Sequence, residues 1–138
     1  MSIDLTSSTI SKSAKSLEVW KGQSLDIVVE VVKLQEQPEG FSIEVPEDLT
    51  GALIKMTVRK EVGDSEVVFE KSSTDSAQIE ISAPAINGEF TVHIVPSDTN
   101  LLEPDTYMFD VWVQLSSGDR GPVIEVSEFI VSEPITSF

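Results

Sequence analysis

The chain has 138 residues, of which 40% are hydrophobic, no cysteine and a formal net charge of −15. The length and hydrophobic content fit one folded domain, and the lack of cysteine excludes disulfides and thiolate metal sites. So negative a chain disfavours nucleic acids and anionic membranes as partners, because both recruit proteins through Lys and Arg. The charge fits either a solvating surface or docking to a basic partner.

The N-terminal segment, residues 1–16, is rich in Ser and Thr and shows no clear hydrophobic period. We expect a flexible arm over 1–16, which could order on a neighbouring subunit, and a β-sandwich domain over 17–138. The segment lacks the charged start and apolar stretch of a signal peptide, and no apolar run approaches the roughly 18 residues that span a bilayer. We therefore expect synthesis in the cytoplasm.

The next part of the chain alternates apolar and polar residues with the period of two that is typical of β-strands. A short edge strand over 41–45 should end at Pro46, because proline cannot donate a hydrogen bond to a neighbouring strand. The other predicted strands here are Leu17–Trp20, Ser24–Lys33, Ala52–Lys60, Val67–Lys71 and Gln78–Ser82.

Two clear strands follow, Phe90–Val95 and Tyr107–Leu115, joined by a proline-bracketed loop. The loop carries a short-helix signal near 97–102, which Ser97 or Asp98 can cap. We expect the leucines of the loop, Leu101 in particular, to close the end of the sandwich.

The last strand, Val123–Ser132, changes phase part-way, since Ile124 and Val126 have the opposite parity to Phe129 and Val131. A one-residue β-bulge near Ser127–Glu128 would place all four side chains in the same core. With no long helical segment, the pattern predicts an all-β antiparallel sandwich of seven to eight strands with one short helical crossing.

Catalytic chemistry finds little support in these residues. His93 is the sole histidine, and its strand position favours a partly covered sheet residue over a general base. There is no G-x-S-x-G motif, glycine-rich phosphate loop or zinc-ligand cluster. We therefore expect no enzyme activity, no catalytic residues, no resident metal and no cofactor. A calcium site in the 97–105 loop, through Asp98, Glu103 and Asp105, is the alternative to a solvated acidic rim.

Three large side chains have the outward parity of their strands, namely Trp20, Met108 and Trp112. Either a loop covers such a ring, or the ring marks a protein interface, where Trp and Met are enriched. These three residues are our predicted protein-interface residues, together with the arm over 1–16.

Three segments resemble small immunoglobulin-like modules of tailed bacteriophages, which include the N-terminal domain of baseplate upper proteins and related tail- or head-fibre attachment modules. The segments are LEVWKGQSLDIVVEV, DLTGALIKMTVRK and GEFTVHIVPSDTNLLEPDTYMFDVWVQLSSGDRGPVIEVSEFIV, within residues 17–132. The shared features are a Lys-Gly turn before a long strand, the turn over 48–51, a Pro-x-Asp-Thr crossing and a Tyr-x-Phe-Asp-Val strand.

This resemblance implies an immunoglobulin-like sandwich and a structural role in the virion, with assembly into a homo-oligomer alongside other virion proteins. We therefore expect a non-enzymatic bacteriophage protein that works by protein–protein docking at a tail, baseplate or fibre-attachment position. The alternative is a carbohydrate- or receptor-binding sandwich, with or without calcium, because exposed aromatic rings can also stack on sugars.

Overall fold

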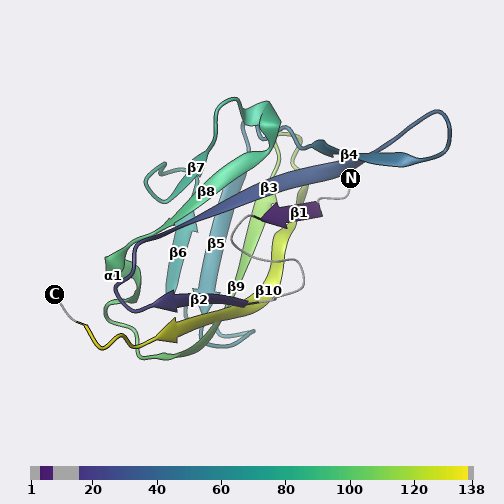
Figure 1. The fold of residues 1–138 in the computed structure, drawn as a ribbon. Coiled ribbons are helices and arrows are strands. Elements are labelled where there is room, and N and C mark those ends of the chain that lie inside the picture. Colours follow the sequence, from purple (N-terminus) through teal and green to yellow (C-terminus); the bar gives the residue numbers. More distant parts are fainter. Residues whose placement is uncertain (1–3, 8–15, 137–138) are drawn as a thin grey trace.

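The computed structural model describes residues 4–7 and 16–136, which form two β-sheets packed face to face (Figure 1). Sheet A has the strand order β1-β3-β8-β7, with β4 also paired to β3, and sheet B has the order β2-β10-β9-β5-β6. Sheet A consists of β1 (Asp4–Ser7), β3 (Leu25–Glu36), β4 (Ser42–Pro46), β7 (Ile79–Ile81) and β8 (Glu89–Ile94). Sheet B consists of β2 (Ser16–Trp20), β5 (Leu53–Arg59), β6 (Phe69–Ser72), β9 (Asp105–Gln114) and β10 (Arg120–Ser132).

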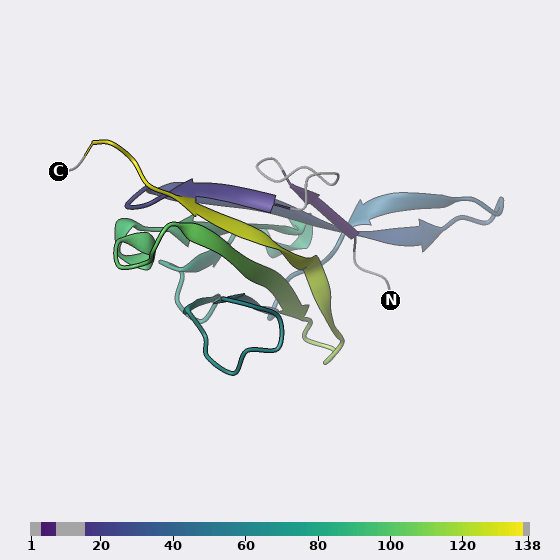
Figure 2. The same ribbon diagram turned by 90° about the horizontal axis from the view of Figure 1, so that it is seen from below.

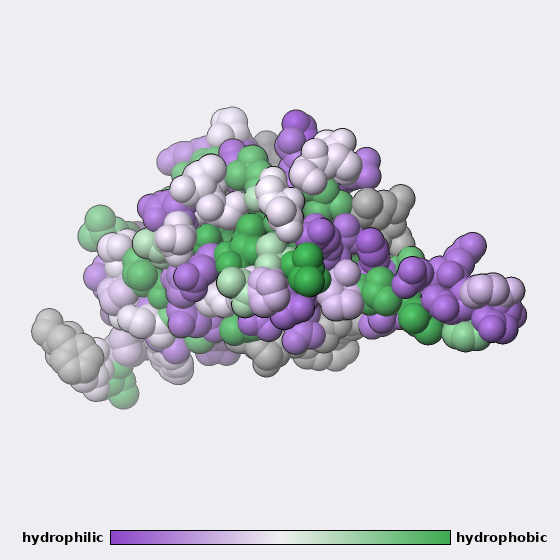
Figure 3. Space-filling view, turned by 90° about the horizontal axis from the view of Figure 1, so that it is seen from above, coloured by the Kyte–Doolittle hydropathy of each residue, from purple (hydrophilic) through white to green (hydrophobic). Residues whose placement is uncertain are grey.

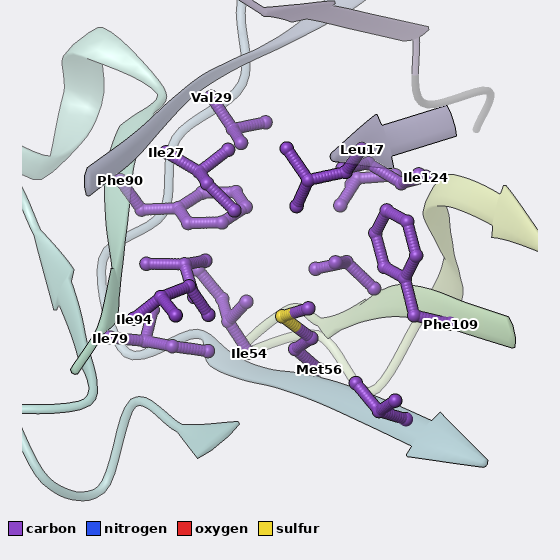
Figure 4. Close-up of a cluster of buried hydrophobic side chains, with 14 of the residues drawn as sticks. Leu17, Ile27, Val29, Ile54, Met56, Ile79, Phe90, Ile94, Phe109 and Ile124 are labelled. Carbon is purple, nitrogen blue, oxygen red and sulfur yellow. The ribbon is translucent and has the colours of Figure 1, made fainter. Parts of the chain in front are cut away.

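The core lies between the sheets and is built from the inward-facing residues of both. Ile27, Val29 and Phe90 come from sheet A, and they meet Met56 and Phe109 of sheet B (Figure 4). Phe129 is fully buried in this core, with its ring edge-on to Phe69 and Phe109 at centroid distances of 5.6 and 6.0 Å. The alternation seen in the sequence is therefore the alternation between core and surface.

The strand order is that of an immunoglobulin-like sandwich. Four strands, β1-β3-β8-β7, follow the A-B-E-D order, and β10-β9-β5-β6 follow the order G-F-C-C′ of a variable-type second sheet. The two N-terminal strands join different sheets. Strand β1 pairs antiparallel with β3 of sheet A, and β2 pairs parallel with β10 of sheet B. The prediction of an all-β, immunoglobulin-like sandwich is confirmed, although the β2–β10 pair is parallel.

A tyrosine corner fixes the entry to β9. The hydroxyl of Tyr107 donates a 2.8 Å hydrogen bond to the backbone oxygen of Glu103, four residues upstream. In immunoglobulin domains the residue two positions after this tyrosine is a disulfide cysteine. Here Phe109 occupies that position, and aromatic packing takes the place of a disulfide.

The crossing between β8 and β9 contains the predicted helical turn, α1 (Pro96–Thr99). The Asp98 carboxylate accepts a 2.8 Å hydrogen bond from the Val95 backbone N–H, so it satisfies a donor at the helix start. The expectation for Leu101 was wrong, because its side chain is 95% exposed. Thr99 is buried instead, and its hydroxyl accepts a 2.9 Å bond from the Gly22 N–H.

Two irregularities interrupt the pairing of β10 with β9, one between Pro122 and Ile124 and one between Ile124 and Ser127. The predicted bulge therefore lies just before its expected place, and a second shift precedes it. Together they keep Ile124 and Phe129 in the core, but Val126 is 45% exposed, so the expectation that it joins the core was wrong.

Strands β3 and β4 form a hairpin that extends past the end of the sandwich (Figures 1 and 2). The expected edge strand over 41–45 is β4. Strand β1 was not predicted and lies within the segment expected to be an arm over 1–16, of which residues 1–3 and 8–15 lie outside the described residues. In the described parts of the chain there are ten strands, rather than seven to eight, since the short β1 and β4 also pair with β3.

The turn before β5 is built as its residues predict. The Asp48 carboxylate accepts hydrogen bonds from the Thr50 backbone N–H at 2.9 Å and from the Thr50 hydroxyl at 2.6 Å. These bonds hold the pKa of Asp48 below its usual value of 3.8. Leu49 is fully buried and anchors the turn, and Gly51 adopts a φ of +73° that disfavours other residues.

Candidate docking face

The outer face of sheet B carries a set of exposed and half-exposed side chains at the outward positions of three neighbouring strands. Because successive strand residues point to opposite faces, the buried residues of β5 and β9 leave every second side chain on this surface. We call this surface the docking face, and it consists of Leu53, Lys55, Thr57, Arg59, Met108, Asp110, Trp112, Gln114, Arg120, Pro122 and Glu128.

Trp112 lies on β9, the central strand of sheet B, and its side chain is 46% exposed. Its indole N–H donates a 3.0 Å hydrogen bond to the Asp110 carboxylate on the same strand. Lys55 on β5 and Pro122 on β10 are its cross-strand partners. No loop of the described residues buries the ring, so its aromatic surface is exposed while its N–H is satisfied by Asp110.

The docking face also carries three of the nine Lys and Arg residues of this acidic chain, Lys55, Arg59 and Arg120. The Arg120 Nε donates a 2.8 Å hydrogen bond to the Gln114 side chain, and the Arg59 guanidinium donates to the Asp64 backbone oxygen. Both guanidinium groups are thus oriented by neutral oxygens.

Two shallow hollows mark this face. The first is lined by Leu53, Lys55, Trp112, Gln114 and Arg120 with the backbone of Val113 between them. The second lies four residues along β9, where Met108 meets Arg59 and the exposed side chains of Val62 and Val126. A shallow apolar surface bordered by charged side chains of both signs suits a macromolecular partner better than a small substrate, which would need a concave pocket.

The three predicted interface residues are not one patch. Met108 and Trp112 share a strand and a face, about 13 Å apart along β9. Trp20, which is 48% exposed, lies on the edge strand β2 opposite Ser132. Ser132 is ten positions from Pro122, the partner of Trp112, which places the two tryptophans at opposite ends of sheet B, roughly 30 Å apart.

Sequence reasoning missed Lys55, Arg120 and Val126 as parts of this surface. The signal for Lys55 was present, since it has the outward parity of a strand that pairs with the Trp112 strand. Strand pairing was needed to bring it opposite Trp112. Val126 was assigned to the core because two register shifts in β10, rather than one, decide which way it points.

His93 lies on the opposite surface, the outer face of sheet A. Its Nδ1 is 2.8 Å from a carboxylate oxygen of Asp26, its cross-strand partner, and its Nε2 is 4.0 Å from Glu80. The ring is therefore held between carboxylates on a flat sheet. The described side-chain partners of His93 are thus Asp26 and Glu80, and neither is a nucleophilic hydroxyl.

Two of the three carboxylates of the crossing loop, those of Asp98 and Asp105, are bound to lysines. Asp98 forms an ion pair of 2.6 Å with Lys71, and Asp105 pairs with Lys60. The hydrogen bond from Lys60 lowers the pKa of Asp105, and the same bond raises the pKa of Lys60. Within residues 4–7 and 16–136, no group of three or more His, Cys, Asp or Glu side chains is placed to hold a metal ion. The same residues contain no helix long and apolar enough to cross a membrane.

No known protein family matches the chain by sequence, and no curated protein matches it. Among solved structures, the chain is similar to murine CRIg, with 16% sequence identity and a TM-score of 0.42. That similarity covers 97% of this chain and 99% of the other. At this level the comparison adds nothing to the strand order, which by itself assigns the immunoglobulin-like sandwich.

Proposed function

We propose that this protein is a non-enzymatic docking module that binds another protein through the docking face, with Trp112 as the central contact. The observation that carries the proposal is the exposure of this ring in the middle of a regular sheet, beside two cations, Lys55 and Arg120, of a chain with a net charge of −15. Trp and Arg are the residues most enriched at binding hot spots.

The charge of the face indicates the chemistry of the partner. Within the docking face Lys55, Arg59 and Arg120 outnumber two carboxylates, those of Asp110, whose oxygen already accepts the Trp112 N–H, and of Glu128, which lies opposite Met108. A partner that fits would present an apolar centre for Trp112 and Met108, bordered by carboxylates. Such complementarity orients the partners and raises the rate of association.

The setting that we propose is the virion of a tailed bacteriophage, in which the chain serves as a tail, baseplate or fibre-attachment module. The support is the resemblance of the segments within residues 17–132 to such modules. The fold supports it only in general terms, because an immunoglobulin-like sandwich serves many unrelated functions.

The test pairs a binding measurement with a stability measurement. The purified chain and its Trp112→Ala variant are titrated by surface plasmon resonance against each protein encoded beside its gene. We expect the substitution to weaken binding at least tenfold, the loss typical of a hot-spot residue. The melting temperature should stay nearly constant, since the ring is a surface residue outside the core.

Leu101→Ala is the matched control, because Leu101 is 95% exposed and lies in the turn after α1, at the end of the sandwich. Equal binding by all three proteins would contradict the proposal. So would a parallel loss of folding in the Trp112→Ala variant, which would assign the ring to the core.

Carbohydrate binding is the second candidate, and one observation favours it. The hollow beside Trp112 is bordered by the polar side chains of Lys55, Gln114 and Arg120, a combination that can stack on and hydrogen-bond to a sugar. A glycan array probes this directly, and a calcium-dependent rise in melting temperature probes a cation requirement. Glycan binding that disappears with Trp112→Ala would favour this function over protein docking.

A further inference from the structure

The β3–β4 hairpin is an overhang of sheet A that sheet B does not cover. In the body of the molecule the odd-numbered residues of β3, Ile27, Val29 and Val31, face the core. The same face continues along the hairpin through Gln35 and its cross-strand partner Ile43. Figure 3 shows hydrophobic surface among hydrophilic residues on this projecting arm.

Large apolar side chains are exposed on both faces of the overhang. Phe41 is 53% exposed and Ile43 is 42% exposed on the core-side face, and Leu34 is 51% exposed on the other. A hairpin of two strands is marginally stable alone and cannot bury such side chains against itself. Their exposure makes this arm a candidate contact surface.

The outer edge of β4 offers the backbone groups for such a contact. Hydrogen bonds from Gln37 N to Phe41 O and from Glu47 N to Val31 O set the pairing of the hairpin at its two ends. By the alternation of antiparallel pairs, Phe41, Ile43 and Val45 direct their N–H and C=O groups to β3. Ser42 and Glu44 direct theirs outward, where no other strand of the described chain pairs with β4.

In natural proteins a lysine, a proline or a bulge usually prevents an edge strand from pairing with another chain. Here the only proline of β4 is Pro46, at its end, and the strand carries the single charge of Glu44. The edge is therefore open to pairing with another strand over residues 42–45.

We propose that a second copy of this chain pairs with this edge, so that two β4 strands align antiparallel about a two-fold axis at Ile43. This register gives Ser42 and Glu44 of each copy a complete pair of backbone hydrogen bonds with the other copy. It places Phe41 against Val45 and Ile43 against itself, which makes one continuous apolar row across the interface. It also places each Glu44 opposite Ser42, so the two carboxylates are not directly opposed.

The register shifted by one residue, with the axis at Glu44, has poorer side-chain and backbone pairing. Centring the axis on Glu44 would place two carboxylates directly opposite each other, which is destabilising. It would also pair Ser42 with Pro46, which has no N–H to donate. The register centred on Ile43 is thus self-complementary, as a closed two-fold interface requires. The inference goes beyond the proposed function, because the docking face lies on sheet B and stays free in this dimer.

Cysteine cross-linking of the full chain tests the register, because the protein has no cysteine of its own. In the proposed dimer the two Ile43 Cα atoms form a non-hydrogen-bonded pair about 4.5 Å apart, within the range for a disulfide. The Ile43→Cys variant should therefore form a covalent dimer under mild oxidation. The Glu44→Cys variant should not, since its Cα atoms would be about 8 Å apart or more, beyond disulfide reach.

Sedimentation of the unmodified chain tests the dimer itself. The dimer fraction should rise with protein concentration by mass action. It should also rise with salt, because two copies with a net charge of −15 repel each other and salt screens that repulsion. Ile43→Lys should abolish the dimer, whereas Leu101→Lys, the same charge change in the turn after α1, should preserve it. Trp112→Ala should also preserve it, which separates this inference from the proposed function.

Three results would overturn the inference. One is a monomer at every salt and protein concentration, and another is equal cross-linking of the Ile43→Cys and Glu44→Cys variants. The third is a dimer that survives Ile43→Lys but is lost with Trp112→Ala, which would assign self-association to the docking face.

Discussion

At the scale of single residues, the parity of a strand predicted which side chains face outward but not what surrounds them. The alternation around Trp112 placed its ring on the surface, and the structure agrees. That the ring would stay uncovered, tied to Asp110 and opposite Lys55, depends on strand pairing between distant segments. Parity likewise grouped Trp20 with Trp112, although the two lie at opposite ends of sheet B.

Asp48 should make stability depend on pH. Its hydrogen bonds to Thr50 lower its pKa in the folded state, so its contribution is present above the usual value of 3.8 and is lost as the pH falls through the lowered pKa. The melting temperature of the Asp48→Ala variant should lie below that of the unmodified chain from pH 7 to pH 5. The gap should shrink below pH 4, whereas a gap that is constant down to pH 2 would contradict this role.

Tyr107 gives a second prediction at this scale. Tyr107→Phe keeps the ring but removes the hydrogen bond to the Glu103 carbonyl, which should cost about 1 kcal/mol of unfolding free energy. Urea denaturation would measure this loss of unfolding free energy. The slope of free energy against urea concentration should stay unchanged. Unchanged stability would mean that the corner does not contribute to the fold.

At the scale of elements, the strands and the helical crossing could be predicted because their residues carry the relevant period or turn chemistry. The wrong predictions concern side chains whose direction the local sequence leaves open and contacts with distant segments decide. In the crossing loop, Leu101 looked like the residue that closes the sandwich, yet Thr99 is buried there because it accepts the Gly22 N–H. In β10, the pairing with β9 decides the shifts that turn Val126 outward.

The ion pair between Lys71 and Asp98 joins β6 to the crossing loop. Its side chains are only 6% and 13% exposed, and its atoms are 2.6 Å apart. Lys71→Met should cost about 3 kcal/mol, because it leaves the Asp98 carboxylate buried without its cation.

The matched control is Lys60→Met, which breaks the exposed pair with Asp105 and should have a much smaller effect, since solvent screens that pair. Equal effects of the two substitutions in chemical denaturation would contradict a buried, stabilising pair.

At the scale of the whole molecule, composition and strand pattern predicted a sandwich, and the strand order makes it immunoglobulin-like. The charge of −15 did not predict that three of the nine cations lie on one face of sheet B. It also did not predict the overhanging β3–β4 hairpin, because Phe41 and Ile43 have the alternation of an ordinary edge strand. The two surfaces are separate, so the two proposed contacts do not exclude each other.

Hydroxyl-radical footprinting tests the central claim most directly, because mass spectrometry reads the oxidation of each residue separately. The chain would be oxidised alone and in complex with the neighbouring gene product that binds it. We predict that oxidation of Trp112 and Met108 falls several-fold in the complex, while oxidation of the exposed Leu101 is unchanged. Equal oxidation of Trp112 in the free and bound chain would contradict docking through this face.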